Sequence, residues 1–172
     1  KALLNTDNVI RMRVEGTDWG LACNGIHFLD LFSFLTGCSD FEFTNLRVDQ
    51  VIPDFKRPKS KEFIGEMVGI NSEGHQLAMN CKAGVIDSKN LRGLKTLNID
   101  NGTTHHQITV YPDQVTHRTL TGKNETEVTE PLPLQSQITH HLVEDIVQGG
   151  SCGLPTYPDS MTLHLSLIRE FL

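Results

Sequence analysis

One apolar segment, residues 19–37, most constrains what this chain can fold into. Its apolar residues are too dense for the alternation of a strand, and the run is too long for a typical strand. The pattern predicts a largely buried helix over residues 25–36, with Gly37 as its C-terminal stop. No apolar run reaches the ~20 residues that a membrane-spanning helix needs. The helix is therefore expected to belong to the core of a soluble protein.

Two ionisable side chains interrupt this segment, His27 and Asp30, and they stand three residues apart. That spacing places them on one face of a helix. A buried charge is costly unless it has a partner, so the pair needs an explanation. In one interpretation the aspartate holds a structural histidine, or either group reaches the exposed edge of the helix. In the other, His27 is a general acid or base, because histidine ordinarily titrates near neutral pH.

The rest of the chain predicts a sheet and two closing helices. Strands are indicated where apolar and polar residues alternate, and hairpins where turn residues separate two such runs. The predicted elements are a strand around residues 10–14, strands over 41–52 and 62–70, a turn at 71–74, a hairpin at Asn101-Gly102, strands through Val115 and Val128, a helix capped by Ser136 and ended by Gly149 and Gly150, and a helix after Asp159 and Ser160. This order predicts a single α+β domain over residues 1–172, a largely antiparallel sheet with helices packed on one side.

Charge and cysteine usage limit the partners. The chain has 15 basic and 21 acidic residues, a net charge of −6, and no long run of either sign, so neither nucleic acid nor an anionic membrane is an expected partner. Its four cysteines are scattered, without a Cys-x-x-Cys pair, and therefore indicate neither a zinc framework nor disulfide stapling. Free thiols favour a cytoplasmic protein.

The apolar segment resembles the second domain of the Gfo/Idh/MocA oxidoreductases, NAD(P)-dependent enzymes that act mostly on sugars, inositols and related polyols. Members show a glycine-rich turn, then Asp-x-Gly-x-His, two further residues, an Asp, and an apolar helix that ends at Gly. Five positions match this pattern: Gly20, Gly25, His27, Asp30 and Gly37. Cys23 departs from it, because the family usually has its substrate-contacting aspartate there.

The resemblance implies a fold and an assembly. The fold would be that of a glyceraldehyde-3-phosphate dehydrogenase-like C-terminal domain, with an open sheet face that packs against another subunit in a homo-oligomer. Its partner would be the protein's own N-terminal Rossmann domain, whose Gly-x-Gly-x-x-Gly fingerprint and Lys-Pro motif do not occur in this sequence. NAD or NADP would bind to that domain, so no cofactor-binding residue is expected in these 172 residues, which alone would bind no nucleotide and be inactive.

The resemblance also implies residue roles. His27 would be the catalytic base and Asp30 would orient it, while Trp19, Cys23 and Asn24 would line a pocket for a sugar, a polyol or a similar secondary alcohol. Trp19 is alternatively a core anchor. Cys23 supports a different function, a non-catalytic ligand-binding or dimerisation module of the same fold.

A metal site is a third interpretation of the sequence. It is the least favoured of the three, and no residue is predicted to bind a metal. Its candidate ligands are His105-His106, His140-His141, His164, Glu144 and Asp145. Adjacent histidines on a strand point to opposite faces, and exposed polar residues on amphipathic helices are more often simply solvated.

Overall fold

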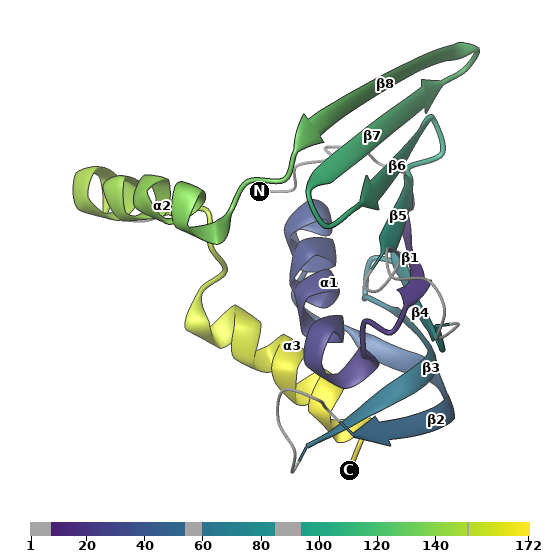
Figure 1. Ribbon diagram of the computed structural model, residues 1–172. Coiled ribbons are helices and arrows are strands. Elements are labelled where there is room, and N and C mark those ends of the chain that lie inside the picture. The colour runs from purple at the N-terminus through teal and green to yellow at the C-terminus, as the bar shows by residue number, and fades with distance from the viewer. Residues whose placement is uncertain (1–7, 54–59, 85–93, 151) are drawn as a thin grey trace.

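A computed structural model of the protein describes residues 8–53, 60–84, 94–150 and 152–172 (Figure 1). The sequence Lys56-Arg57-Pro58-Lys59, which predicts a short basic loop, lies outside them. Within the described residues there are eight strands and three helices. Their order is β1 (Arg11–Thr17), α1 (Leu21–Thr36), β2 (Glu42–Pro53), β3 (Lys61–Ile70), β4 (Gln76–Lys82), β5 (Lys95–Asp100), β6 (Thr104–Val110), β7 (Gln114–Thr121), β8 (Asn124–Pro131), α2 (Gln135–Gly149) and α3 (Tyr157–Arg169).

All eight strands form one sheet in the order β2-β3-β4-β1-β5-β6-β7-β8. The prediction of a largely antiparallel sheet is right for every described pairing except that of β1 with β4, which is parallel. Parallel neighbours need a long crossover, and here α1, β2 and β3 separate the two strands in sequence. The first strand thereby joins two antiparallel sets, one on each side of it.

The core lies between one face of this sheet and the helices α1 and α3 (Figure 1). Met12 and Val14 point into it, at 2% and 0% exposure, whereas Arg11 and Arg13 between them are exposed. This confirms the alternation read from the sequence. Within the hairpins, Asn71 accepts backbone hydrogen bonds from Glu73 and His75 in the β3–β4 turn, and Gly102 takes a positive φ of 82° in the β5–β6 turn.

Helix α1 is longer than predicted at its start. It begins at Leu21, so Cys23 and Asn24 belong to its first turn. Leu21 is fully buried, and this anchor extends the helix back to Gly20, whose φ of 74° turns the chain into it. At the other end Gly37 has the predicted left-handed conformation, and its N–H bonds to the Ser33 carbonyl.

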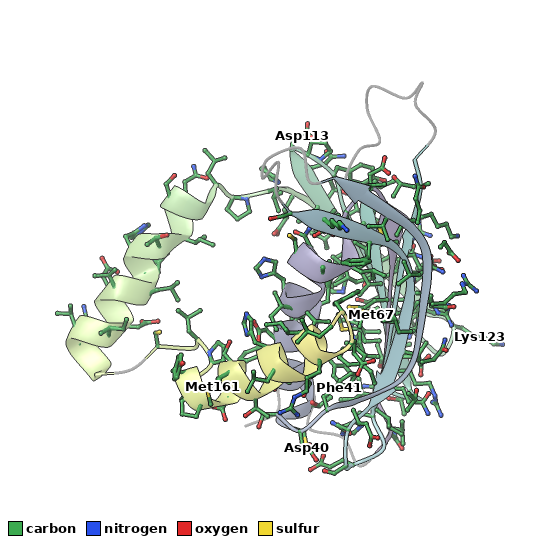
Figure 2. All side chains as sticks on the ribbon, turned by 90° about the horizontal axis from the view of Figure 1, so that it is seen from below. Asp40, Phe41, Met67, Asp113, Lys123 and Met161 are labelled. Carbon is green, nitrogen blue, oxygen red and sulfur yellow. The ribbon has the colours of Figure 1, made fainter. Side chains whose placement is uncertain are left out.

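Helix α2 stands away from the sheet and from the other helices (Figures 1 and 2). The prediction of helices packed on one side is therefore right for α1 and α3 and wrong for α2. Its cap also differs: Leu134, not Ser136, precedes the helix, and the Gln137 side chain accepts the Leu134 N–H at 2.8 Å. Four of its apolar side chains are exposed: Ile138, Val143, Ile146 and Val147.

Helix α3 begins at Tyr157, before the predicted start after Asp159 and Ser160, and Thr156 caps it. The Thr156 hydroxyl accepts the Asp159 N–H at 3.4 Å. Helix α3 buries Leu163 and Leu167, whereas its apolar side chains Met161, Leu165 and Ile168 are exposed. None of the helices in the described ranges is long and apolar enough to cross a membrane.

Candidate functional site at the start and middle of helix α1

The turn that leads into α1 is fixed by contacts with the sheet. Trp19 is only 3% exposed; its ring packs edge-on against Phe28, with ring centroids 5.2 Å apart, and its Nε1 donates to the Asn80 carbonyl. Before it, Asp18 accepts the N–H of Gly84 at 2.9 Å. The indole thus lies in the core beneath the helix start, and a contact between Trp19 and a substrate stays a prediction.

A carboxylate from β3 closes the N-terminus of α1. Glu62 is 8% exposed, and its Oε1 accepts the backbone N–H of Cys23 at 2.8 Å. The N-terminal residues of a helix carry unpaired N–H groups and a partial positive charge, so an anion there is stabilising. A Cβ at Gly20 would collide with this carboxylate, which explains why glycine occupies the position. Glu62 has no local signal in the sequence, because it caps a helix whose first turn lies 39 residues away.

Cys23 and Asn24, the two other predicted substrate contacts, lie half-buried in the first turn of α1. The Asn24 side-chain amide donates to the Trp19 carbonyl, so one of its polar groups already serves the turn. Cys23 is held at its backbone by Glu62. The fold therefore brings a buried carboxylate beside the position where Cys23 replaces the aspartate of the family pattern.

His27 and Asp30 lie one helical turn further along. His27 is exposed and Asp30 is half-buried. The Oδ1 atom of Asp30 is buried and has no hydrogen-bond partner among the described residues. Burial raises the pKa of the Asp30 carboxyl, while the nearby imidazoles of His164 and His27 act against that shift. The structure thus gives an accessible imidazole with a partly shielded carboxyl beneath it.

His164 of α3 is a second imidazole near Asp30 that the predicted site did not include. Its Nδ1 lies 2.8 Å from the Ser160 carbonyl, which can only accept, so Nδ1 carries a proton. The two helices approach closely at Gly25, where an added Cβ would already touch Leu167. No sequence spacing relates His164 to Asp30, because helix packing alone brings them together.

The residues considered for a metal site are not assembled into one. His105 lies 3.8 Å from Asp100, and on α2 His141 lies 3.8 Å from Glu144. In the described part of the chain, no group of three or more His, Cys, Asp or Glu side chains has a geometry that could hold a metal ion. His106 lies beside His117 of β7 instead, with their rings stacked and their centroids 5.3 Å apart.

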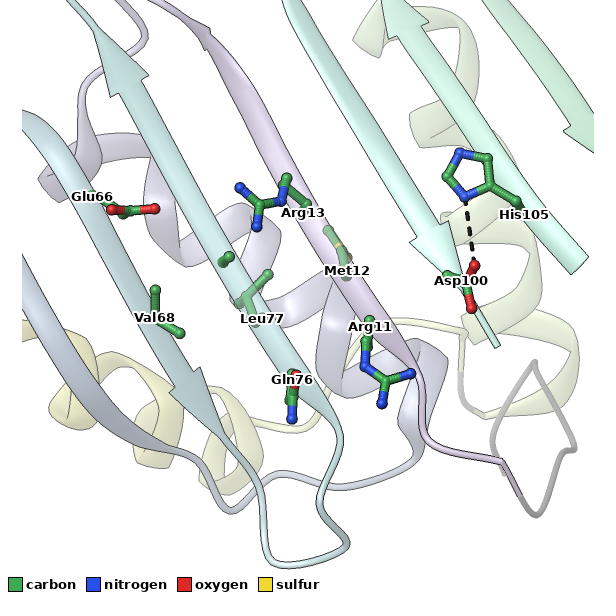
Figure 3. A pocket seen from close by; sticks show the side chains of 10 residues that line it. Arg11, Met12, Arg13, Glu66, Val68, Gln76, Leu77, Asp100 and His105 are labelled. Carbon is green, nitrogen blue, oxygen red and sulfur yellow. Dashed lines mark ion pairs between the residues drawn. The ribbon is translucent and has the colours of Figure 1, made fainter. Parts of the chain in front are cut away.

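A cavity of about 480 Å³ lies on the face of the sheet opposite α1 (Figure 3). Arg11 and Arg13 of β1 reach over it, with Glu66 and Gln76 from the neighbouring strands, and His105 faces Asp100 at its edge. These are the polar residues that alternate with the core positions. This cavity is therefore part of the open sheet face and is separate from His27.

Comparisons with solved structures find this fold in oxidoreductases. A candidate oxidoreductase from Erwinia carotovora atroseptica SCRI1043 superposes with a TM-score of 0.67 at 16% identity, covering 95% of this chain and 55% of that one. A variant of KijD10, a 3-ketoreductase from Actinomadura kijaniata in complex with TDP-benzene and NADP, gives 0.61 at 11% identity, covering 94% and 51%. A candidate NADPH-dependent oxidoreductase from Desulfitobacterium hafniense DCB-2 gives 0.56 at 11%, covering 94% and 52%.

These likenesses, at such low identity, show a shared fold. The chain spans about half the length of each of these structures. No protein-family model matches the sequence, and neither does any curated protein sequence.

Proposed function

We propose that the protein is the substrate-binding, catalytic-base-bearing C-terminal domain of an NAD(P)-dependent oxidoreductase of the Gfo/Idh/MocA type, with the corresponding glyceraldehyde-3-phosphate dehydrogenase-like fold. Its substrate would be a sugar, a polyol or a similar secondary alcohol. The observation that carries the proposal is the exposed His27 with a half-buried Asp30 on the same face of α1. The shared fold with oxidoreductases supports it.

The chemistry assigned to this chain is the movement of one proton. When a secondary alcohol becomes a ketone, its carbon loses a hydride and its hydroxyl loses a proton. A ring nitrogen of His27 accepts that proton, and Asp30 stabilises the imidazolium that forms, as a carboxylate does for histidine in other acid–base pairs. His164, close to Asp30, is a positioning residue that acts on His27 only through this carboxyl.

Among the residues that the structure describes, no glycine-rich turn between a strand and a helix is present to hold the nucleotide. The glycines of the sequence at Gly149-Gly150 end helix α2 and Gly153 follows it, so they do not form the turn between a strand and a helix that cradles a pyrophosphate. NAD or NADP, which would take the hydride, is therefore assigned to a Rossmann domain outside this chain. What remains here is substrate binding and proton transfer.

A non-catalytic ligand-binding or dimerisation module is the second candidate function. Cys23 favours it, because a thiol stands where the family pattern has a carboxylate that contacts substrate. Glu62 favours the enzyme, since it supplies a buried carboxylate at the same helix end. Activity of the full-length protein decides between them.

The test replaces His27 by alanine in the full-length protein and compares turnover of secondary alcohols with NAD+ and NADP+. General base catalysis contributes roughly 10²- to 10⁴-fold, so kcat should fall by about that factor while the Kd for nucleotide stays unchanged. His140→Ala on α2 is the matched control and should turn over normally, because that helix stands away from α1. Unchanged kcat in His27→Ala would remove the proposed base. A wild-type protein inactive on every alcohol tried would favour the non-catalytic module.

A further inference from the structure

Three polar atoms from β6 and β7 form a nearly equilateral triangle. His106 Nδ1 lies 3.1 Å from His117 Nε2 and 3.2 Å from the hydroxyl of Thr119, and this hydroxyl lies 3.1 Å from His117 Nε2. The two strands pair in antiparallel fashion with Thr119 directly opposite His106, so their regular register sets these distances. We call this cluster the imidazole triangle.

The imidazole triangle lies on strands β6 and β7, on the face of the sheet that carries the core, and it is open to solvent. His106 is paired with the buried Ile99, and His117 with the half-buried Ile108, so both rings point to the side of the sheet that carries the core. His117 is nevertheless exposed, and His106 and Thr119 are half-buried. A small solute can therefore reach all three atoms.

Hydrogen bonding does not satisfy all three sides of the triangle. A neutral ring nitrogen either donates or accepts, so between two such nitrogens and one hydroxyl only two hydrogens serve three close contacts. A cation in place of those hydrogens would use the lone pairs of all three atoms at once.

We propose that the imidazole triangle binds a divalent transition-metal ion of the Zn²⁺ type. Ligand nitrogens of a tetrahedral zinc ion are about 3.3 Å apart when its bonds are 2.0–2.1 Å long, close to the separations found here. An ion about 2.05 Å from each of the three atoms would sit about 1 Å above their plane. The remaining coordination position is open to water.

The chemistry of the ligands selects the ion. Imidazole suits Zn²⁺, Cu²⁺ and Ni²⁺, whereas Mg²⁺ and Ca²⁺ prefer carboxylate, carbonyl and water oxygens. Each ring must be neutral to bind the ion, so binding should weaken at acidic pH. The site has two imidazoles and one hydroxyl. It therefore differs from a group of three or more His, Cys, Asp or Glu side chains, which the described residues lack.

Calorimetric titration of the full-length protein with ZnCl₂, after removal of bound metals with EDTA, tests the proposal. One equivalent of Zn²⁺ should bind, and Mg²⁺ should not. His117→Ala should weaken Zn²⁺ binding by at least about 100-fold, because even loss of a group behind a ligand costs roughly 10- to 100-fold. His117 is exposed, so the fold should survive the change, which circular dichroism verifies.

His105→Ala is the matched control, because His105 lies on the same strand but lines the cavity on the other face. It should bind Zn²⁺ like the wild type. His141→Ala tests the competing pair on α2, where the rings of His140 and His141 are tilted by 42° with their centroids 3.8 Å apart. Wild-type affinity in His117→Ala, loss of binding in His105→Ala or His141→Ala instead, or no stoichiometric binding by the wild type would each overturn the proposal.

Discussion

Asp30 is held in two opposing environments. Its Oδ1 atom is buried without a partner among the described residues, which disfavours the charged form, while His164 and His27 lie close enough to favour it. Burial has the larger effect, and the pKa of the carboxyl is raised above 3.8. The native protein therefore binds a proton here at a pH where the unfolded chain has already released it.

Asp30→Asn is expected to raise the free energy of unfolding at pH 7. Because the folded pKa of Asp30 is raised, its contribution to stability is fully present below pH 3.8 and is lost as pH rises through the folded pKa. The gain in the variant should be no more than about 1 kcal/mol, since water screens a half-exposed carboxylate. Urea unfolding at pH 7 and near pH 3 measures it. The gain should vanish at the acidic pH, and a loss of stability at pH 7 would contradict the burial argument.

Individual site residues differ in how far sequence reveals them. The nearness of His27 and Asp30 follows from their spacing on a helix. Glu62 and His164 reach the same helix from β3 and α3, and their distances depend on how separate elements pack. For Trp19, the apolar residues around it in the sequence indicate that the ring is buried. They do not indicate whether one edge of the ring contacts a pocket.

At the scale of elements, the start of α1 depends on Glu62 rather than on a residue of the helix itself. Gly20 at the N-cap has no side chain to accept a hydrogen bond, and the first turn of α1 has no acidic residue. Glu62 supplies the missing acceptor from the neighbouring strand.

Replacing Glu62 by alanine should therefore lower the free energy of unfolding by about 1–2 kcal/mol, the usual cost of losing a helix cap. Glu62→Gln keeps an acceptor oxygen and should lose less. Glu66→Ala is the matched control, since Glu66 lies on the same strand and its ion pair with Arg47, at 3.8 Å, is exposed on the arginine side. Guanidinium unfolding separates the three variants. Equal losses for Glu62→Ala and Glu66→Ala would show that the contact with Cys23 does not hold the helix end.

Elements with local signals were predicted well. Both hairpins, at Asn71–Gly74 and at Asn101-Gly102, follow from turn residues that act over four positions. Helix starts were less predictable: Leu21, Gln135 and Tyr157 all precede the expected residues, because tertiary anchoring or a different cap extends each helix. The parallel pairing of β1 with β4 has no local signal at all.

At the scale of the whole molecule, α1 and α3 cover one face of the sheet, and none of the described helices covers the other. The uncovered face carries the cavity bordered by Arg11 and Arg13 (Figure 3). We propose that a homo-oligomer forms through this face, as the family resemblance implies. Its polar residues would meet those of a second copy across a two-fold axis.

Ala78→Arg should weaken that association. Ala78 lines the cavity. An arginine at this position fills the space and adds a third positive charge beside Arg11 and Arg13. A stable interface buries about 800 Å² on each partner, so a charged side chain in its middle disrupts most of it. Light scattering of the full-length protein should show smaller particles. Val128→Arg places the same side chain on the opposite face of the sheet and should leave the wild-type assembly intact. A monomeric wild type, or an unchanged assembly in Ala78→Arg, would contradict this interface.

The central place of β1 has a consequence for how the protein is made. A ribosome releases β1 before either of its neighbours, β4 and β5, has been synthesised. Until they follow, the backbone groups on both edges of this strand have only water as a partner. β1 lies between two sets of antiparallel strands, so each hairpin can form locally, but the sheet is continuous only once β1 has paired with both β4 and β5. A nascent chain would be most prone to mispairing of β1 in the interval between the synthesis of β1 and the synthesis of β4 and β5.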